Sequence, residues 1–326
     1  MPLPRKRKRR MKNKVILGID TSNYTTSLGI VSLGGELIAN LKMPLEVACG
    51  ERGLRQSDAL FAHTKNIPII MERAKDMLDD CEIVAVGVSD KPRNVEGSYM
   101  PCFLAGVSVA SAVSTAVGCE HFCFSHQCGH IMAAIHSSGA LNLLNGKFAA
   151  YHVSGGTTEL LLVTPTDNGF LCEKIGGTLD LNAGQAIDRI GVSLGLKFPC
   201  GPAIERLALE CNEKIGLPVS VKGTWANFSG LENSVARLIS EGKSREYIAR
   251  YTLEYVAKTL DKMTSALLAE HHDIPVLFAG GVMSNSIIKD KIRKKYNAWF
   301  AEPSLSSDNA VGIAYLTLRA YNSKNK

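Results

Sequence analysis

Short apolar runs separated by polar turns dominate the start of the chain. Val15–Ile19 and Leu28–Leu33 predict two buried strands joined by the polar run Asp20–Thr26, and a Gly34-Gly35 turn leads to a third strand. Apolar spacing then predicts further elements in this order: a helix over Ser57–Leu78, a strand over Ile83–Val88, a helix over Cys102–Val117, a strand near Phe122 and a helix from about His126.

The second half of the chain opens with the same pattern. LGIDTSNYTTSLGIV and YHVSGGTTELLLV both read as apolar strand, Ser/Thr/Gly-rich turn and apolar strand. The strands expected here are Phe148–Val153, Leu160–Thr164 and Gly169–Ile175. After them we expect a mainly helical stretch over Ala183–His272, a strand over Val276–Ala279, a helix from about Asn285, a strand near Trp299 and a closing helix from about Asp308.

This repetition predicts an α/β protein with two related lobes and a cleft between them. We expect an N-terminal lobe over residues 11–145, with the boundary near Leu144–Lys147. A C-terminal lobe then covers residues 146–326, with a helical insertion at about 183–272.

The positive charge of the chain is concentrated at its beginning. The formal net charge is +6, and six of the 37 basic residues lie in Arg5–Arg10, so the other 31 basic residues balance the 31 acidic ones. Composition therefore does not support a general nucleic-acid-binding surface. Because MKNKVILGID from Met11 would itself make an ordinary start, we interpret residues 1–10 as a disordered extension, with a nucleic-acid-binding or targeting arm as the alternative.

Cysteine usage and hydropathy indicate the compartment. The chain has nine cysteines, an odd number, with no CxxC pair and no apolar signal core at its start, which favours a reducing, cytoplasmic environment. The longest weakly polar helix candidate, Leu104–Gly118, is shorter than the roughly 20 apolar residues that span a bilayer. We therefore expect no association with a membrane.

Four turns rich in small residues are candidates for a nucleotide site. They are the turn after Asp20, SGG at Ser154–Gly156 followed by Thr157, NAGQ at Asn182–Gln185 including Gly184, and FAGGV at Phe278–Val282 including Gly280 and Gly281. A strand that ends in small residues exposes backbone N–H groups, and a following helix N-terminus adds partial positive charge, so such turns can hold phosphate. Any one of them is weak evidence, but four on a duplicated frame favour a nucleotide cleft.

The stretch SHQCGH places His126 and His130 on one face of a helix that Ser125 would cap. Two imidazoles at this spacing can share a metal ion, although such pairs are often structural. No glutamate follows His126, so the HExxH arrangement of metalloproteases is absent. A divalent ion would also want a carboxylate, for which Asp308 is a candidate, but its spacing alone favours an ordinary helix cap.

The motifs HxxxH, VSGGTTE, DLNAGQAIDRIGVSLGL, FPCGP, FSGL, FAGGVMSN and PSLSSDNA occur in this order, and with them the chain resembles the TsaD (Gcp) family. The resemblance covers nearly the whole chain after Met11 and implies the actin-like (ASKHA, RNase H-like) fold. It also implies an acyltransferase that moves a threonylcarbamoyl group from threonylcarbamoyl-AMP to N6 of the adenosine 3′ of the anticodon in tRNA. The expected partners are tRNA, a smaller TsaB-like paralogue and a TsaE-like ATPase.

The resemblance also assigns roles to residues. His126, His130 and Asp308 match the family's catalytic metal ligands, usually of iron or zinc. His152 stands where some members place a tyrosine near the metal, and it is either a further ligand or an inward-facing strand histidine. The nucleotide, ATP or an acyl-adenylate, is expected at positions that match this chain's Gly155, Gly156, Asp188, Gly201 and Asn285.

Three departures from the family pattern leave the acceptor open. Glu96–Gly106 replaces a GPGL-containing segment, Gln185 replaces a glutamate, and Thr157 replaces an asparagine or histidine. The alternatives to tRNA modification are therefore carbamoyl transfer to a small-molecule acceptor and a non-catalytic nucleotide-binding scaffold. The retained histidines argue against the scaffold, since a scaffold needs no metal ligands.

Overall fold

The computed structural model describes residues 13–22, 24–46, 54–167, 169–213, 215–305 and 310–325. It divides into two compact units, and the division falls inside one helix, α3 (His126–Ser137). The first unit takes residues up to 132, 167–169 and 308–326, and the second takes residues 133–166 and 170–307. Residues 1–10, Asp308 and the turn residue Asn23 lie outside the described residues.

The first unit is built on a five-stranded sheet in the order β3-β2-β1-β4-β5. β1 pairs antiparallel with β2 and parallel with β4, so it lies at the centre of the sheet. Its last six residues are all buried, which explains why this strand reads as one continuous apolar run and not as an alternation. The strands are β1 (Asn13–Asp20), β2 (Thr25–Ser32), β3 (Leu37–Pro44), β4 (Cys81–Lys91) and β5 (Glu120–Ser125).

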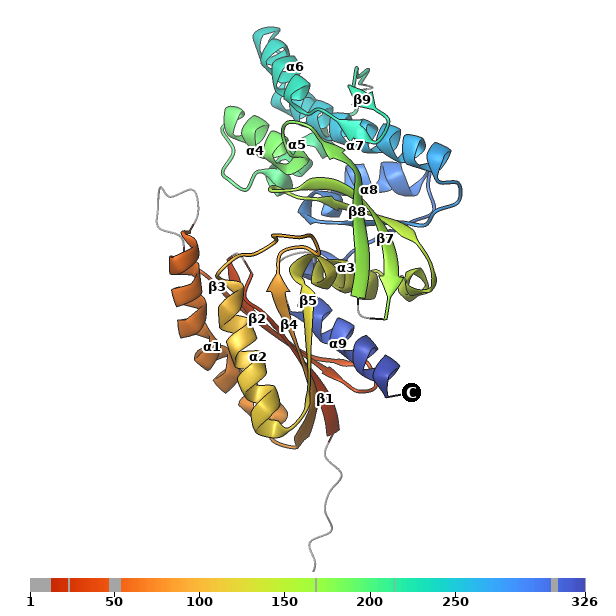
Figure 1. Ribbon diagram of the computed structural model, residues 1–326. Helices are drawn as coiled ribbons and strands as arrows, with labels where there is room; N and C mark the ends of the chain where they lie inside the picture. The colour runs from red at the N-terminus through yellow and green to blue at the C-terminus, as the bar shows by residue number, and fades with distance from the viewer. Residues whose placement is uncertain are drawn as a thin grey trace, which may run out of the picture. The chain divides into compact units, whose positions relative to one another are not determined.

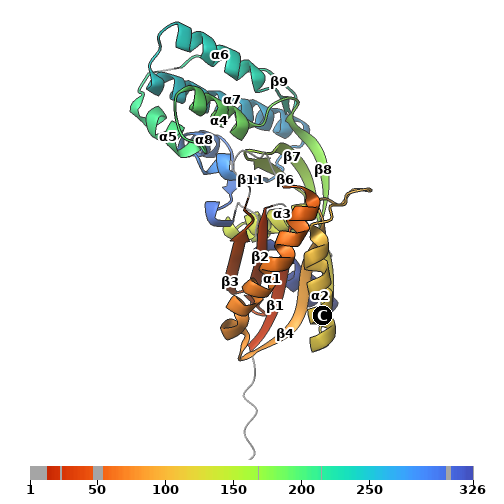
Figure 2. The same cartoon turned by 90° about the vertical axis from the view of Figure 1, so that its left-hand side faces the viewer.

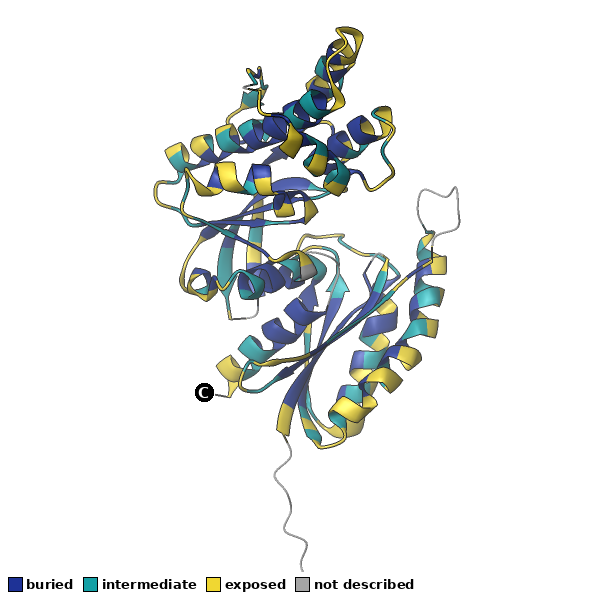
Figure 3. Ribbon diagram, turned by 180° about the vertical axis from the view of Figure 1, so that it is seen from behind, coloured by how far each residue is buried: buried dark blue, intermediate teal, exposed yellow. Residues whose placement is uncertain are grey.

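Helices cover both faces of this sheet. α1 (Gln56–Leu78) and α2 (Phe103–Val117) contact each other and lie together on one face (Figures 1 and 2). α9 (Val311–Lys324) packs against β1, β2, β4 and β5 on the other face, and most of its length is buried (Figure 3). The sequence predicts this closing helix in the second lobe, and that prediction is wrong, because α9 belongs to the first unit.

A row of three glycines explains how α9 approaches the sheet. Gly18 of β1 pairs with Gly29 of β2 on one side and Gly87 of β4 on the other. A Cβ atom on Gly18 would lie 2.5 Å from the Ala310 carbonyl oxygen and 2.5 Å from the Ala314 nitrogen. Because these three positions have no side chains, the backbone of α9 can pack directly against the sheet.

Replacing Gly18 with alanine should lower the free energy of unfolding by about 1–3 kcal/mol, the usual cost of overpacking a core. The helix backbone cannot step aside without losing its packing on the other strands. Urea unfolding of the variant measures the loss. The matched control is Gly34→Ala, whose added Cβ would have only the Ser32 hydroxyl near it, at 3.6 Å. Equal stability of the two variants would contradict this account of α9.

The second unit contains a seven-stranded sheet in the order β12-β11-β6-β7-β8-β10-β9. Five of these strands repeat the first sheet, because β8-β7-β6-β11-β12 has the same order as β3-β2-β1-β4-β5. The duplicated α/β architecture expected from the sequence is thereby confirmed. The strands are β6 (Phe148–Val153), β7 (Thr158–Thr166), β8 (Gly169–Thr178), β9 (Val221–Lys222), β10 (Trp225–Ala226), β11 (Val276–Ala279) and β12 (Ala298–Phe300).

The expected helical stretch over residues 183–272 holds four helices and the short β9–β10 hairpin. The 26-residue α7 is its centre, packing against α4, α5, α6 and α8 in one large hydrophobic core. The four helices are α4 (Ala183–Ser193), α5 (Gly201–Glu210), α6 (Ser229–Ser240) and α7 (Arg245–Glu270). Outside this stretch the second unit contains α8 (Ser286–Arg293) and the 3-10 turns η1 (Leu141–Asn145), η2 (Gly281–Ser284) and η3 (Pro303–Leu305). No helix in the described parts of the chain is long and apolar enough to cross a membrane.

Asp180 fastens the start of α6 to the end of β8. Its carboxylate accepts hydrogen bonds from the backbone N–H groups of Phe228 at 2.8 Å and Ser229 at 3.0 Å. Burial alone would raise the pKa of Asp180, but the hydrogen bonds from the Ser229 side chain and from these backbone groups outweigh it and lower the pKa to about 2.

The stabilising effect of Asp180 should therefore depend on pH. A folded-state pKa below the unfolded value means that the ionised group stabilises the fold above about pH 4, and that this contribution is lost as the pH falls toward 2. Asp180→Asn should be less stable than the wild type at pH 5, and the difference should narrow at pH 3, as measured by urea unfolding at both values. A difference that does not change with pH would contradict the assignment.

Candidate functional site

His126 and His130 occupy the first turns of α3, as the sequence predicted. The hydroxyl of Ser125 accepts a hydrogen bond from the Cys128 N–H at 3.3 Å, which is the expected helix cap. One helical turn separates the two histidines, and their Nε2 atoms lie 2.8 Å apart. Cys128 points into the core and is 1% exposed, as expected of a structural thiol.

The imidazole pair fits a divalent metal. Two nitrogen ligands at about 2.0–2.1 Å from an ion lie about 2.9–3.4 Å from each other, close to the observed separation. Within the described parts of the chain, no three His, Cys, Asp or Glu side chains gather in a metal-binding arrangement. Asp308, the expected third ligand, lies outside the described residues, and His152 lies in the second unit on β6, so both roles stay predictions.

Asp20, expected among the nucleotide-binding residues, ends β1 beside His126. It is 0% exposed, and its Oδ2 lies 3.0 Å from the Nδ1 atom of His126. Asp20 therefore contacts the ring nitrogen of His126 that faces away from His130. Its expected contact with a nucleotide stays a prediction.

The divergent segment Glu96–Gly106 packs next to this histidine. Thr21, which follows Asp20, donates its hydroxyl proton to the Cys102 carbonyl at 3.0 Å and accepts from the Gly106 N–H at 3.1 Å. The Phe103 ring meets the His126 ring edge-on, with 6.3 Å between centroids. The segment that departs most from the family pattern thus forms part of the surroundings of His126.

In the second unit, the SGG turn and the N-terminus of α4 lie against each other. The Gly184 N–H donates to the Ser154 carbonyl at 3.2 Å. A Cβ on Gly184 would lie 2.6 Å from the Gly155 nitrogen and 2.6 Å from the Ser154 oxygen. Gly155 and Gly156 are exposed with open space around them, so the turn presents its backbone beside the positive end of a helix.

Thr157 and Gln185, two of the departures, have defined local roles. The Thr157 N–H donates to the Ser154 hydroxyl at 3.1 Å, which closes the SGG turn. Gln185 completes a capping box with Asn182 at the start of α4, a role that glutamine and glutamate both perform. The Thr157 contact uses its backbone N–H, which any residue except proline would supply there, and the Gln185 contact uses its side chain.

Asp188 holds the start of α5 in place. Its Oδ1 accepts a 2.7 Å hydrogen bond from the Cys200 N–H, directly before Gly201, the first residue of α5. A Cβ on Gly201 would meet nothing within 4 Å, so the backbone there is open. Asp188 thereby positions Gly201, which is one of the predicted nucleotide-binding residues. A direct contact of Asp188 with the nucleotide stays a prediction.

The FAGGV turn completes the group. Gly280 has φ +99°, and a Cβ there would lie 2.3 Å from the Val153 carbonyl oxygen, so this position requires glycine. Gly281 begins η2 in open space, and Asn285 caps α8 by accepting from the Ile288 N–H at 3.1 Å. The predicted residues of the second unit thus lie at neighbouring element ends, the termini of β6, β11, α4, α5 and α8.

Sequence reasoning missed three residues of these networks. Ser22 and Ser89 contact Asp20, and Glu205 of α5 accepts from the N–H of Ser286, the first residue of α8, at 2.7 Å. Ser89 could have been found, because it lies in VGVSD near the carboxyl end of β4, the parallel neighbour of β1. No sequence pattern marks Glu205, because the residue that it contacts, Ser286, lies 81 positions away.

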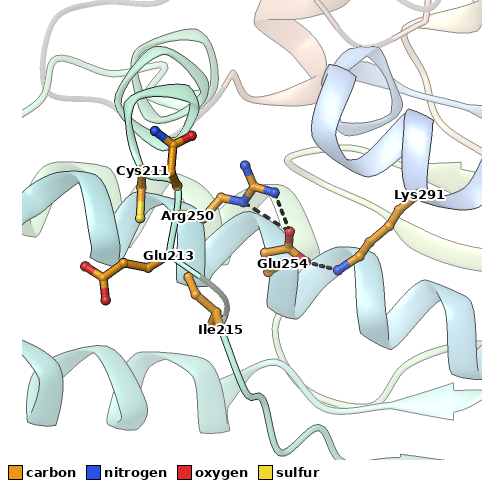
Figure 4. Close-up of a pocket in the computed structure, with 7 residues that line it drawn as sticks. Cys211, Glu213, Ile215, Arg250, Glu254 and Lys291 are labelled. Atoms are coloured by element: carbon orange, nitrogen blue, oxygen red, sulfur yellow. Dashed lines mark hydrogen bonds and ion pairs between the residues drawn. The ribbon is translucent and has the colours of Figure 1, made fainter.

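A cavity of about 460 Å³ in the second unit contains none of the predicted residues. Figure 4 shows Arg250 of α7 and Lys291 of α8 both directed at Glu254, which pairs with each of them. Burial and the neighbouring Arg250 lower the pKa of Lys291. Because its two cations already share one buried carboxylate, we assign this cavity no part in the function.

Solved structures confirm the fold. HypF from T. kodakarensis aligns with a TM-score of 0.61 at 14% identity, over 96% of this chain and 48% of that chain. A ROK family glucokinase from Streptomyces griseus, solved in complex with glucose and AMPPNP, aligns with a TM-score of 0.51 at 12% identity, over 93% of this chain and 99% of that chain. Identities this low support a shared architecture and nothing finer.

Sequence comparison is more specific. The family model described as "tRNA N6-adenosine threonylcarbamoyltransferase" matches residues 52–315. Relatives with that same name include those of Thermosipho africanus, 29% identical over 94% of both chains, and Bacillus thuringiensis, 30% identical over 95% of this chain and 92% of the other. The match spans both units and includes the histidine pair and all the second-unit turns described above. The chain therefore belongs to the TsaD family.

Proposed function

We propose that this protein transfers a threonylcarbamoyl group from threonylcarbamoyl-AMP to N6 of the adenosine 3′ of the anticodon in tRNA. The observation that carries the proposal is the family match over residues 52–315, together with relatives of that name that align over nearly the whole of both chains. The paired histidines and the open backbone turns supply the two kinds of site that such a reaction needs.

The second unit binds the nucleotide part of the donor. Gly155 and Gly156 are exposed, and the N-terminus of α4 lies against the same turn, which favours a phosphate there. Asn285 and the start of α5, held by Asp188, lie at neighbouring element ends and bind the adenosine. ATP and its analogues are recognised through the same groups.

The first unit holds a divalent metal through His126 and His130, with Asp308 as the proposed third ligand. Such an ion acts as a Lewis acid toward a carbonyl oxygen. Thiol and hydroxyl nucleophiles are not required, because the acceptor amine is itself the nucleophile. The N6 amine forms a C–N bond with the carbamoyl carbon, the bond from that carbon to the phosphate oxygen breaks, AMP leaves, and the amine loses one proton to solvent.

Binding of the tRNA substrate requires additional surface from other proteins. Outside Arg5–Arg10 the chain has as many acidic as basic residues, which gives little general attraction for a polyanion. We propose that a smaller TsaB-like paralogue supplies additional RNA-binding surface and that a TsaE-like ATPase assists turnover.

The test is an assay of purified protein with transcribed tRNA and freshly made threonylcarbamoyl-AMP, with and without the two partner proteins. Digestion of the tRNA and mass spectrometry of its nucleosides measure the modified adenosine. We expect modification that needs tRNA with an adenosine 3′ of the anticodon. Donor turnover that proceeds equally well without tRNA would overturn the proposal.

That second outcome would favour carbamoyl transfer to a small molecule. One observation favours this alternative: Phe103, in the divergent segment, contacts His126. A different segment beside His126 would change which acceptor is bound and would leave the donor and metal sites intact. A panel of small amines in the same assay distinguishes the two functions.

A further inference from the structure

We propose that Asp20 is a positioning residue for the metal site, orienting His126 through its Nδ1 atom so that its Nε2 atom is presented to the ion. The inference rests on the proposed function only in requiring a metal at the histidine pair. It assigns Asp20 a role other than the nucleotide contact expected from the sequence.

Among the described residues, four donors hold the Asp20 carboxylate rigidly. Its Oδ1 accepts from the Ser22 N–H at 3.2 Å and from the Ser89 hydroxyl, and its Oδ2 accepts from the Ser22 hydroxyl at 2.9 Å and from His126 at 3.0 Å. Asp20, Ser22 and Ser89 are each 0% exposed. A buried carboxylate is costly unless its oxygens are hydrogen-bonded, so this arrangement fixes the carboxylate in one orientation.

The elements that supply these donors explain the rigidity. Asp20 ends the central strand β1, Ser89 lies near the end of the neighbouring parallel strand β4, and Ser22 follows Asp20 in the chain. The ends of two neighbouring strands and the turn that directly follows β1 therefore hold the carboxylate in place.

The contact with Asp20 fixes which nitrogen of His126 carries the proton. A carboxylate oxygen accepts, so the Nδ1 atom 3.0 Å away must donate. In the neutral ring the lone pair then lies on Nε2, the atom 2.8 Å from Nε2 of His130. The metal-facing nitrogen of His126 is thus prepared as a ligand before any ion binds.

The same geometry argues against Asp20 as a metal ligand alongside His130. Asp20 contacts the nitrogen of His126 opposite the one that faces His130. Carboxylates that bond the outer nitrogen of a metal-binding histidine fix its ring and raise its basicity, and their loss typically weakens metal binding about 10- to 100-fold.

The experiment compares Zn²⁺ affinity in the full-length wild type and in Asp20→Asn, by competition with a chromogenic chelator. We expect the variant to bind Zn²⁺ about 10- to 100-fold more weakly. Nitrogen-15 NMR of the apo protein should show His126 protonated at Nδ1 in the wild type and a mixture of tautomers in the variant. A purely structural role for Asp20 would leave the tautomer unchanged.

Two further variants make the result decisive. Ser27→Ala removes a buried hydrogen bond to the backbone of Asp20 and leaves its carboxylate alone, so Zn²⁺ affinity should stay within about twofold of the wild type, a change of under about 0.5 kcal/mol. Ser89→Ala removes one donor to the carboxylate and should weaken binding in the same direction as Asp20→Asn, by less.

Zn²⁺ affinity in Asp20→Asn equal to that of the wild type, or an equal loss in Ser27→Ala, would overturn the inference. A wild type that binds Zn²⁺ but transfers nothing to tRNA would refute the proposed function and leave the role of Asp20 standing. The two failures are therefore distinguishable.

Discussion

Removing both imidazoles by a His126→Ala/His130→Ala double substitution should abolish metal binding by the purified protein. The wild type is expected to carry about one iron or zinc per chain, since two nitrogen ligands already lie at a ligand-to-ligand separation suited to one ion. The double variant should carry close to none after the same purification and reconstitution. Elemental analysis of both proteins measures the difference.

Transfer to tRNA should fall with the metal. Lewis-acid stabilisation by a bound ion contributes several kcal/mol to a transition state, and about 1.4 kcal/mol corresponds to a tenfold change in rate. We therefore expect the double variant to lose at least about 100-fold in the rate of tRNA modification, while its affinity for a non-hydrolysable ATP analogue stays close to that of the wild type. The nucleotide contacts proposed here come from the second unit, which the two substitutions leave unchanged.

His121→Ala is the matched control for metal binding. His121 lies on β5 in the same unit, is exposed, and has a sulfur contact with Cys123 at 3.9 Å. Its replacement should leave the metal content unchanged. A wild type that takes up no metal on reconstitution, or a double variant that retains it, would make the histidines structural and would favour the scaffold function over the transferase.

The elements of the fold were predictable because their signals are local. Apolar runs bounded by glycine and polar turns marked β1, β2, β6 and β7, and the repeated pattern indicated a duplication that the strand orders confirm. The placement of α9 was not predictable in this way. It depends on the alignment of Gly18, Gly29 and Gly87 across three strands, and this alignment exists only once the strands have paired.

In the site, too, contacts between residues close in sequence could be predicted, and contacts that depend on strand pairing could not. His126 and His130 lie four residues apart on one helix, so helical geometry alone brings them together. The contact of Asp20 with His126 spans 106 positions and depends on the order of β1, β4 and β5 in the sheet. Sequence spacing could mark Asp20 as polar at a strand end but could not name its partner.

Gln185 shows how a local rule can correct an inference from resemblance. In the sequence, its difference from the family glutamate is one of the three departures that leave the acceptor open. The spacing of Asn182 and Gln185 is that of a capping box, which the structure contains. The side chain is engaged at the start of α4, so this departure is no evidence against nucleotide binding.

Nucleotide affinity should depend strongly on the absence of a side chain at Gly184. In Gly184→Ala the new Cβ would lie within 2.7 Å of three backbone atoms of Ser154 and Gly155, so the SGG turn must move away from α4. Overpacking of this kind costs about 1–3 kcal/mol. If the turn and the helix end together hold the phosphates, the displacement should weaken binding of AMPPNP by at least about tenfold, which corresponds to about 1.4 kcal/mol.

Isothermal titration of AMPPNP into Gly184→Ala and Gly146→Ala measures this effect against a matched control. Gly146 lies in the same unit with an extended backbone, and a Cβ there would meet nothing within 4 Å, so its replacement should leave the affinity unchanged. Thermal unfolding of both variants separates a displaced turn from a destabilised unit, since only the former weakens binding in a protein that remains folded. Equal affinities would mean that the nucleotide does not use the SGG turn, and the phosphate site would then have to be sought at Gly280 and Gly281, where β11 ends and η2 begins.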